Sequence, residues 1–209
     1  MDNISEKLKE REVAIMYKIP ILSVLVLVLL SGGPAKATLI YEDWLVHDGD
    51  QYDILTVLND ATLGMTGGEV RRLYTNHAST LNFFDGTVSW LTASDTSTMY
   101  IYGGLTEHAL ILERESTVNL FGGTIGERVR ISDSGRVNIY GYGFEFLADE
   151  GTGGISGLLS GHWLDHTPFT IRFEDLSKPF PGTQIQLIPE PSVFLLLCFG
   201  ALILKRRNR

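Results

Sequence analysis

A repeat of 18 to 19 residues dominates this 209-residue chain between Thr62 and Phe144. Each copy opens on a segment in which apolar residues occupy every second position, with a glycine at or near its end. Repetition at a fixed short period is typical of stacked architectures, in which each unit buries its apolar face only against its neighbours. The five copies begin with Thr62–Gly68, Thr80–Gly86, Thr98–Gly104, Thr117–Gly123 and Arg136–Tyr142.

The alternation predicts a β-strand with one buried face, because every second side chain of a strand points the same way. A second apolar group follows in each copy without a helical pattern, so an all-β coil fits better than a leucine-rich repeat. The chain is therefore predicted to be all-β, a single-stranded β-solenoid of about five 18–19-residue coils over residues 62–144. The expected inward column is Leu63, Leu81, Met99, Val118 and Val137.

The outward positions form two parallel rows, and two interpretations of them stay open. They could be ladders that stabilise the sheet through cross-strand pairs. They could instead form an exposed platform that binds a sugar polymer or a protein partner, since large exposed apolar patches tend to be interaction sites. The residues of this possible ligand-binding face are Phe84, Tyr102, Phe121 and Tyr140 in one row and Asn82, Asn119 and Asn138 in the other.

Charge and cysteine content exclude several classes of function. Residues 38–188 carry 20 acidic residues against 8 lysines and arginines, a net charge of −12. This disfavours nucleic acid as a partner, because phosphate binding needs a basic patch. The only cysteine is Cys198, so no thiolate metal site is expected. Because His162 and His166 lie in a turn-forming sequence and not on one face of a helix, we expect no metal site there. We also expect no cofactor and no catalytic residue.

The N-terminal segment has the pattern of a secretory signal peptide. Lys18 precedes an apolar run over residues 19–30, and an Ala-x-Ala site follows at Ala35 and Ala37. The run is shorter than the ~20 residues that a membrane span needs. We expect signal peptidase to remove residues 1–37, and Met16 is a second possible start.

The segments around the repeats predict caps and a linker. Residues 38–61 are interpreted as an N-terminal cap or an incomplete coil. Residues 145–176 contain two strand-like segments separated by a turn at Asp165–Pro168, which predicts a C-terminal β cap over the last coil. Residues 177–188 include two prolines and are interpreted as a linker.

The C-terminal tail has three parts. Pro189, Glu190 and Pro191 precede an apolar run over residues 193–204, which is followed by a basic cluster over residues 205–209. The tail resembles the PEP-CTERM sorting signal of Gram-negative bacteria. The resemblance implies a transmembrane sorting helix and processing by exosortase near the Pro-Glu-Pro motif. It also implies a membrane-anchored precursor that is released to the cell surface or the exopolysaccharide matrix.

Two classes of function follow from these features. The first is an exported, non-enzymatic surface or extracellular-matrix protein, structural or adhesive, with exopolysaccharide or another surface protein as a possible partner. The alternative is a small β-helix enzyme that acts on polysaccharides. Such an enzyme needs convergent carboxylates at a fixed separation, and no acidic pair lies in register on the aromatic face.

Overall fold

The computed structural model describes residues 37–151, 156–174 and 184–189. These residues form strands, turns and loops, and no helix that could span a membrane occurs among them. Ala37 and Pro189 fall within the described part. The expected signal peptide with Ala35, the expected sorting helix, Glu190 and Pro191 lie outside it.

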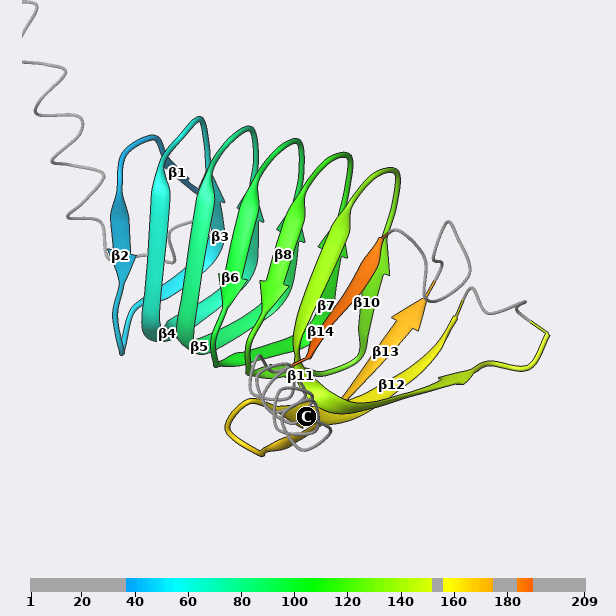
Figure 1. Ribbon diagram of the computed structural model, residues 1–209. Coiled ribbons are helices and arrows are strands. Elements are labelled where there is room, and N and C mark those ends of the chain that lie inside the picture. Colours follow the sequence, from blue (N-terminus) through cyan, green and yellow to red (C-terminus); the bar gives the residue numbers. More distant parts are fainter. Residues whose placement is uncertain (1–36, 152–155, 175–183, 190–209) are drawn as a thin grey trace, which may run out of the picture. The chain divides into compact units, whose positions relative to one another are not determined.

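The repeats form a β-solenoid, as the sequence predicts (Figure 1). Strand pairing between copies is parallel and in register, with Thr62 opposite Thr80, Thr80 opposite Thr98, and Thr98 opposite Thr117. The strands of the repeats are β4 (Thr62–Thr75), β5 (Thr80–Ala93), β6 (Thr98–Ile101), β7 (Leu105–Leu112), β8 (Thr117–Leu120), β9 (Thr124–Ile125), β10 (Arg128–Ile131) and β11 (Arg136–Ala148).

Each coil contributes to two sheet faces. The beginnings of β4, β5 and β11 pair with β6 and β8 to make the first face. The ends of β4 and β5 pair with β7 and β10 to make the second face. The bend between the faces lies at a glycine with positive φ, such as Gly104 at 75° and Gly123 at 85°. A Cβ added to the neighbouring Gly103 would lie 2.3 Å from the Phe84 carbonyl oxygen, so only glycine permits this close coil stacking.

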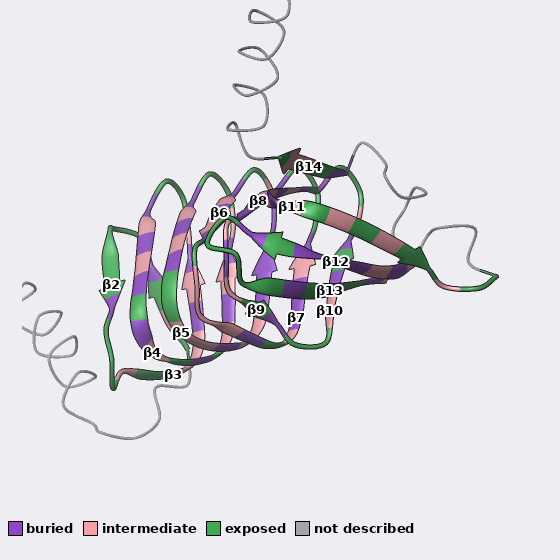
Figure 2. Ribbon diagram, turned by 60° about the horizontal axis from the view of Figure 1, so that its bottom comes forward, coloured by how far each residue is buried: buried purple, intermediate pink, exposed green. Residues whose placement is uncertain are grey.

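The core is a continuous column between the two faces. The five residues of the predicted inward column are all fully buried, which confirms the predicted register. Burial alternates along the strands of the repeats (Figure 2). Each such side chain contributes about 1.5–3 kcal/mol of hydrophobic free energy. On the second face, Leu73, Leu91 and Leu110 fill the opposite side of the same core.

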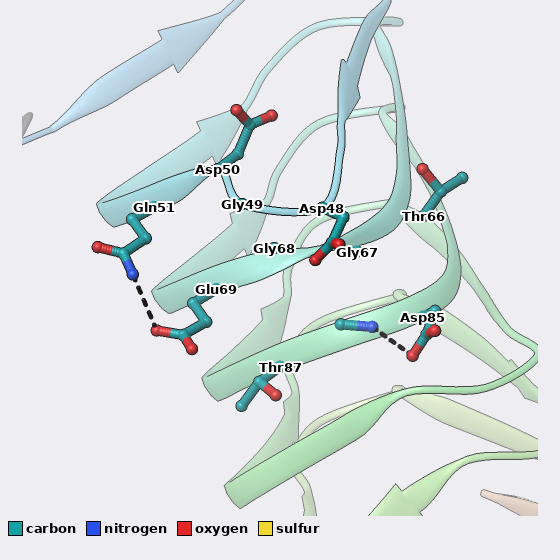
Figure 3. Close-up of a pocket in the computed structure, with 11 residues that line it drawn as sticks. Asp48, Gly49, Asp50, Gln51, Thr66, Gly67, Gly68, Glu69, Asp85 and Thr87 are labelled. Carbon is teal, nitrogen blue, oxygen red and sulfur yellow. Dashed lines mark hydrogen bonds between the residues drawn. The ribbon is translucent and has the colours of Figure 1, made fainter.

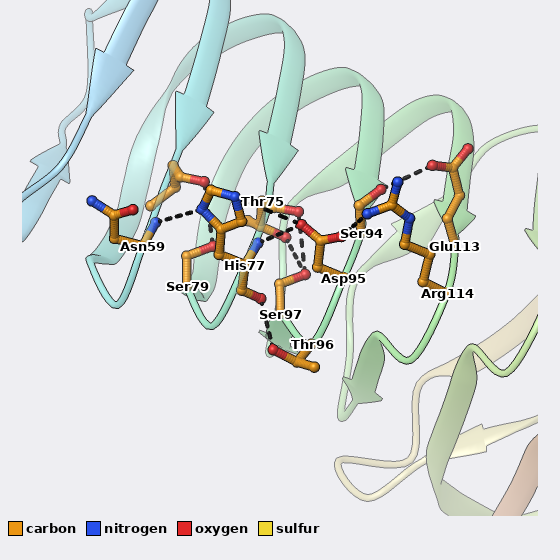
Figure 4. A network of polar contacts seen from close by, with 11 residues as sticks. Asn59, Thr75, His77, Ser79, Ser94, Asp95, Thr96, Ser97, Glu113 and Arg114 are labelled. Atoms are coloured by element: carbon orange, nitrogen blue, oxygen red, sulfur yellow. Dashed lines mark hydrogen bonds and ion pairs between the residues drawn. The ribbon is translucent and has the colours of Figure 1, made fainter.

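A row of left-handed residues forms the corner before each first-face strand (Figure 4). The backbone N–H of Asn59 donates to His77 Nδ1 at 3.3 Å, and that of His77 donates to Asp95 Oδ2 at 3.0 Å. The backbone N–H of Arg114 donates to Asp133 Oδ2 at 3.3 Å. The side chains of His77, Asp95, Arg114 and Asp133 thus each bond to the preceding coil. The row consists of Asn59, His77, Asp95, Arg114 and Asp133, with φ between 55° and 62°.

The solenoid begins earlier than the repeats do. Strands β2 (Trp44–Val46) and β3 (Gln51–Val57) pair in parallel with the two halves of β4, and β1 (Thr38–Ile40) pairs with β3. The segment interpreted as a cap or incomplete coil therefore supplies strands to both faces. Its Val46 and Leu55 are fully buried and extend the core column.

The C-terminal end carries the predicted β cap. Strands β12 (Gly157–Trp163) and β13 (Pro168–Glu174) form an antiparallel hairpin. β12 pairs with the extended end of β11, and β13 pairs with β10 on the second face. Trp163 and Phe169 stack with ring centroids 4.1 Å apart inside this cap.

Residues 185–188, which were expected to belong to a linker, lie instead in a strand that also includes Pro189. They form β14 (Ile185–Pro189), which pairs in parallel with β11 from Val137 to Gly141. Their alternation of Ile185 and Leu187 repeats the inward pattern of the other first-face strands. Ile185 is almost fully buried, so this strand covers the open end of the first face. The apolar alternation outweighs the flanking prolines that suggested a linker.

Candidate functional site

The structure brings the four predicted aromatic residues of the first face into one ladder. Ring centroids lie 5.0 Å apart for Phe84 and Tyr102, 5.0 Å for Tyr102 and Phe121, and 4.1 Å for Phe121 and Tyr140. The interplanar angles are 7°, 10° and 17°, so the rings are parallel. Their spacing follows the ~4.8 Å separation of paired strands.

Stacking decides what the aromatic ladder presents to solvent. Parallel rings at these spacings overlap face to face with an offset, which is a favourable arrangement for aromatic pairs. Tyr102 and Phe121 therefore each have a ring on both faces, whereas Phe84 and Tyr140 each stack on one ring. Phe84 and Tyr102 are 49% and 45% exposed, whereas Phe121 and Tyr140 are half-buried. The geometry makes the ladder a stabilising element of the sheet, and its Phe84 and Tyr102 remain exposed.

Two of the three residues of the predicted asparagine row, Asn119 and Asn138, make hydrogen bonds within the protein. Asn138 Nδ2 donates to Asn119 Oδ1 at 2.9 Å, and Asn119 Nδ2 donates to the Met99 carbonyl oxygen at 3.4 Å. Asn119 is buried at 7% exposure, while Asn82 and Asn138 are half-buried. Within the predicted ligand-binding face, the aromatic rings of Phe84 and Tyr102 are thus more exposed than the asparagine side chains.

A hollow of about 450 Å³ lies at the bend between the two faces near the N-terminal end (Figure 3). It is lined by the carboxylates of Asp48, Asp50, Glu69 and Asp85. Asp50 accepts from the His47 backbone N–H at 2.9 Å, and Asp85 accepts from the Gly86 N–H at 2.7 Å. These carboxylates support the turns. Among the described residues, no group of three or more histidine, cysteine or acidic side chains is arranged to hold a metal ion.

The second face carries polar side-chain pairs between successive coils. Arg71 pairs with Asp53, and His108 Nδ1 lies 2.9 Å from Glu127 Oε1. The hydrogen bond from Arg71 is the main cause that lowers the pKa of Asp53. These exposed pairs link neighbouring coils and contribute little each in free energy.

The C-terminal cap brings His162 and His166 to the same tyrosine. The ring of Tyr142 stacks on His162 with centroids 5.3 Å apart, and its hydroxyl lies 2.6 Å from His166 Nδ1. His162 is the last residue but one of β12, and His166 lies in the turn with φ of 71°. The two imidazoles therefore hold the hairpin turn against β11.

Together these features define a parallel β-solenoid with a C-terminal antiparallel β cap. Comparisons with protein-family models, with curated proteins and with solved structures find no match for this chain.

Proposed function

We propose that this chain is an exported protein of the bacterial cell surface or extracellular matrix, with a structural or adhesive role and a tail that serves as a processing signal. The observation that carries the proposal is the three-part tail, in which Pro189, Glu190 and Pro191 precede an apolar run over residues 193–204 and a basic cluster over residues 205–209. Strand β14 ends at Pro189, which is also the first residue of the Pro-Glu-Pro motif. A protease that cuts beyond this residue would leave every described strand in place.

The composition of the tail supports this role. Prolines disfavour a helix and keep the chain extended, which suits engagement by a protease. The apolar run over residues 193–204 is suited to a short stay in the bilayer, and the basic cluster over residues 205–209 favours a cytoplasmic end. By its resemblance to PEP-CTERM signals, the tail is a substrate of exosortase, and Pro189, Glu190 and Pro191 are sorting residues.

Contacts between the outward-facing residues of successive coils support a structural or adhesive role for the body. The aromatic ladder, the asparagine row and the left-handed corner row all join one coil to the next. Such rows stiffen a stack of units that are stable only together. The resulting body suits a protein that holds its form outside the cell without disulfides, since its only cysteine is Cys198.

Mass spectrometry of the surface-associated protein tests the proposal. The mature chain is expected to begin near Thr38 and to lack residues 193–209. The variant Glu190→Ala is expected to accumulate uncut, while Glu150→Ala, a change in an exposed acidic residue of the body, is expected to be processed normally. A surface protein that keeps its basic terminus would contradict the processing proposal. Normal cutting of the Glu190 variant would contradict recognition of the motif.

A further inference from the structure

The second face carries a hollow of about 530 Å³ that spans three coils. At its centre lies Thr92, which is opposite Tyr74 of β4 on one side and opposite Ile111 of β7 on the other. A threonine between two larger side chains leaves a depression in the sheet surface. Trp90 bounds this depression along β5. We call the hollow around Thr92, with its walls of Tyr74, Trp90 and Ile111, the Thr92 cup.

Polar groups lie at both ends of the Thr92 cup. Arg72 is opposite Trp90 at one end, and Asn76 and Glu113 lie at the other. Glu113 Oε2 accepts a hydrogen bond from Ser94 Oγ at 2.9 Å, which orients the carboxylate. Within the described residues, neither the Arg72 guanidinium nor the Asn76 side-chain amide makes a hydrogen bond. These donors and acceptors are therefore available to a ligand in the cup.

The aromatic walls of the Thr92 cup differ from the ladder of the first face. Ladder rings cover one another, as Tyr102 and Phe121 do at 5.0 Å and 10°. Trp90 instead has a tilted neighbour, His108, at 5.3 Å and 43°. The Tyr74 ring stacks on no other ring of the described chain. Both residues are half-buried, so the cup offers partly exposed aromatic surface beside polar groups.

We propose that the Thr92 cup binds one pyranose unit of a neutral saccharide. A pyranose ring has an apolar C–H face, which matches an aromatic wall, and a rim of hydroxyls that both donate and accept hydrogen bonds. Asn76, Arg72 and Glu113 supply the complementary donors and acceptors. The volume falls within the range of about 300–1,000 Å³ that is usual for small-ligand pockets.

The charge of the lining selects among saccharides. One guanidinium and one carboxylate leave the Thr92 cup without net charge, and the chain as a whole carries −8. A uronic acid would therefore gain no net attraction, whereas a neutral sugar forms its hydrogen bonds without a repelled charge. The inference concerns the body alone and does not depend on processing of the tail, so either proposal can fail without the other.

Calorimetric titration of the full-length chain tests the inference. The probes are tetrasaccharides of glucose, mannose and galactose, each up to about 10 mM, a range that detects weak millimolar binding. A uronic acid tetrasaccharide is the charged comparison. Thr92→Phe fills the cup from an outward position of the sheet, where an aromatic residue suits a strand. The matched control is Thr56→Phe, which lies opposite Tyr74 on β3 but outside the cup.

Binding of at least one neutral tetrasaccharide is expected, with a loss of about tenfold or more in Thr92→Phe and in Trp90→Ala. Thr56→Phe and the first-face variant Tyr102→Ala are expected to bind as the unchanged chain does. Circular dichroism checks that each variant is folded. If Trp90→Ala is misfolded, the binding measured for Thr92→Phe decides whether the inference holds. No binding of any neutral probe, unchanged binding in folded Thr92→Phe, or binding of the uronic acid alone would overturn the inference.

Discussion

At the scale of single residues, the corner row shows how different side chains can serve one backbone position. Asn59, His77, Asp95 and Arg114 share a left-handed backbone, and the first three are of the types most often found there. In the sequence, His77 looks like an isolated histidine. The signal that could have revealed the row is its fixed place two residues before the buried serines Ser79, Ser97 and Ser116.

Asp95 is the member of the corner row for which the structure predicts a pH effect. The His77 backbone N–H, and then the Arg114 guanidinium, hold the pKa of the Asp95 carboxyl below its ordinary value. A group whose folded pKa is lowered stabilises the fold above its unfolded pKa, and loses that contribution as pH falls through the folded value. Asp95→Asn keeps a side chain that tolerates positive φ.

Asp95→Asn is therefore expected to lower the free energy of unfolding by about 1 kcal/mol at pH 7. The difference from the unchanged chain should shrink as pH falls below about 4, where the free carboxyl becomes protonated. Urea unfolding at a series of pH values measures both effects. A difference that stays constant down to pH 2 would show that the charge of Asp95 has no part in it.

At the scale of elements, the sequence predicts the strands that recur at a regular spacing and misses the strands that fall outside it. The strands of all five copies and the capping hairpin follow from alternation and turn signals. Strand β14 has the same alternation, but the hairpin is inserted before it, so it lies far outside the 18–19-residue spacing. The coil of β2 and β3 has Asp43 in place of the opening threonine and a single glycine, Gly49, at its bend. The sequence predicted that the ladder residues lie in one row. It did not predict the orientation of their rings, because that orientation depends on side-chain packing, which the repeat spacing does not determine.

The aromatic ladder predicts graded effects of truncation. Phe121 stacks on two rings, Tyr102 and Tyr140, whereas the more exposed Phe84 stacks on one. Each aromatic pair is worth about 0.5–1.5 kcal/mol beyond its buried area. Phe121→Ala is expected to destabilise the protein by about 2–4 kcal/mol, and Phe84→Ala by about half as much. Chemical unfolding measures both, and a larger loss in the Phe84 variant would contradict the stabilising role.

At the scale of the whole molecule, the described chain from Thr38 to Pro189 forms one column of coils with unequal ends. The C-terminal end has the hairpin and β14, whose last residue, Pro189, lacks a backbone N–H and so limits pairing with another strand. At the N-terminal end, Leu39, Tyr41, Trp44 and Leu45 are exposed. The C-terminal end is thus covered by paired strands, whereas the N-terminal end keeps exposed apolar side chains.

The distance between two spin labels tests this single column most directly. Leu45 and Gln186 are exposed and belong to the same outward row, joined through the register of Gly64, Asn82, Tyr100, Asn119 and Asn138. Six strand spacings of ~4.8 Å separate them, or ~29 Å. With Cys198 replaced by serine, electron–electron resonance on Leu45→Cys/Gln186→Cys should give one narrow distribution near that value, ~5 Å longer than for Leu45→Cys/Asn138→Cys. A broad distribution, or equal distances for the two pairs, would contradict a solenoid closed by β14.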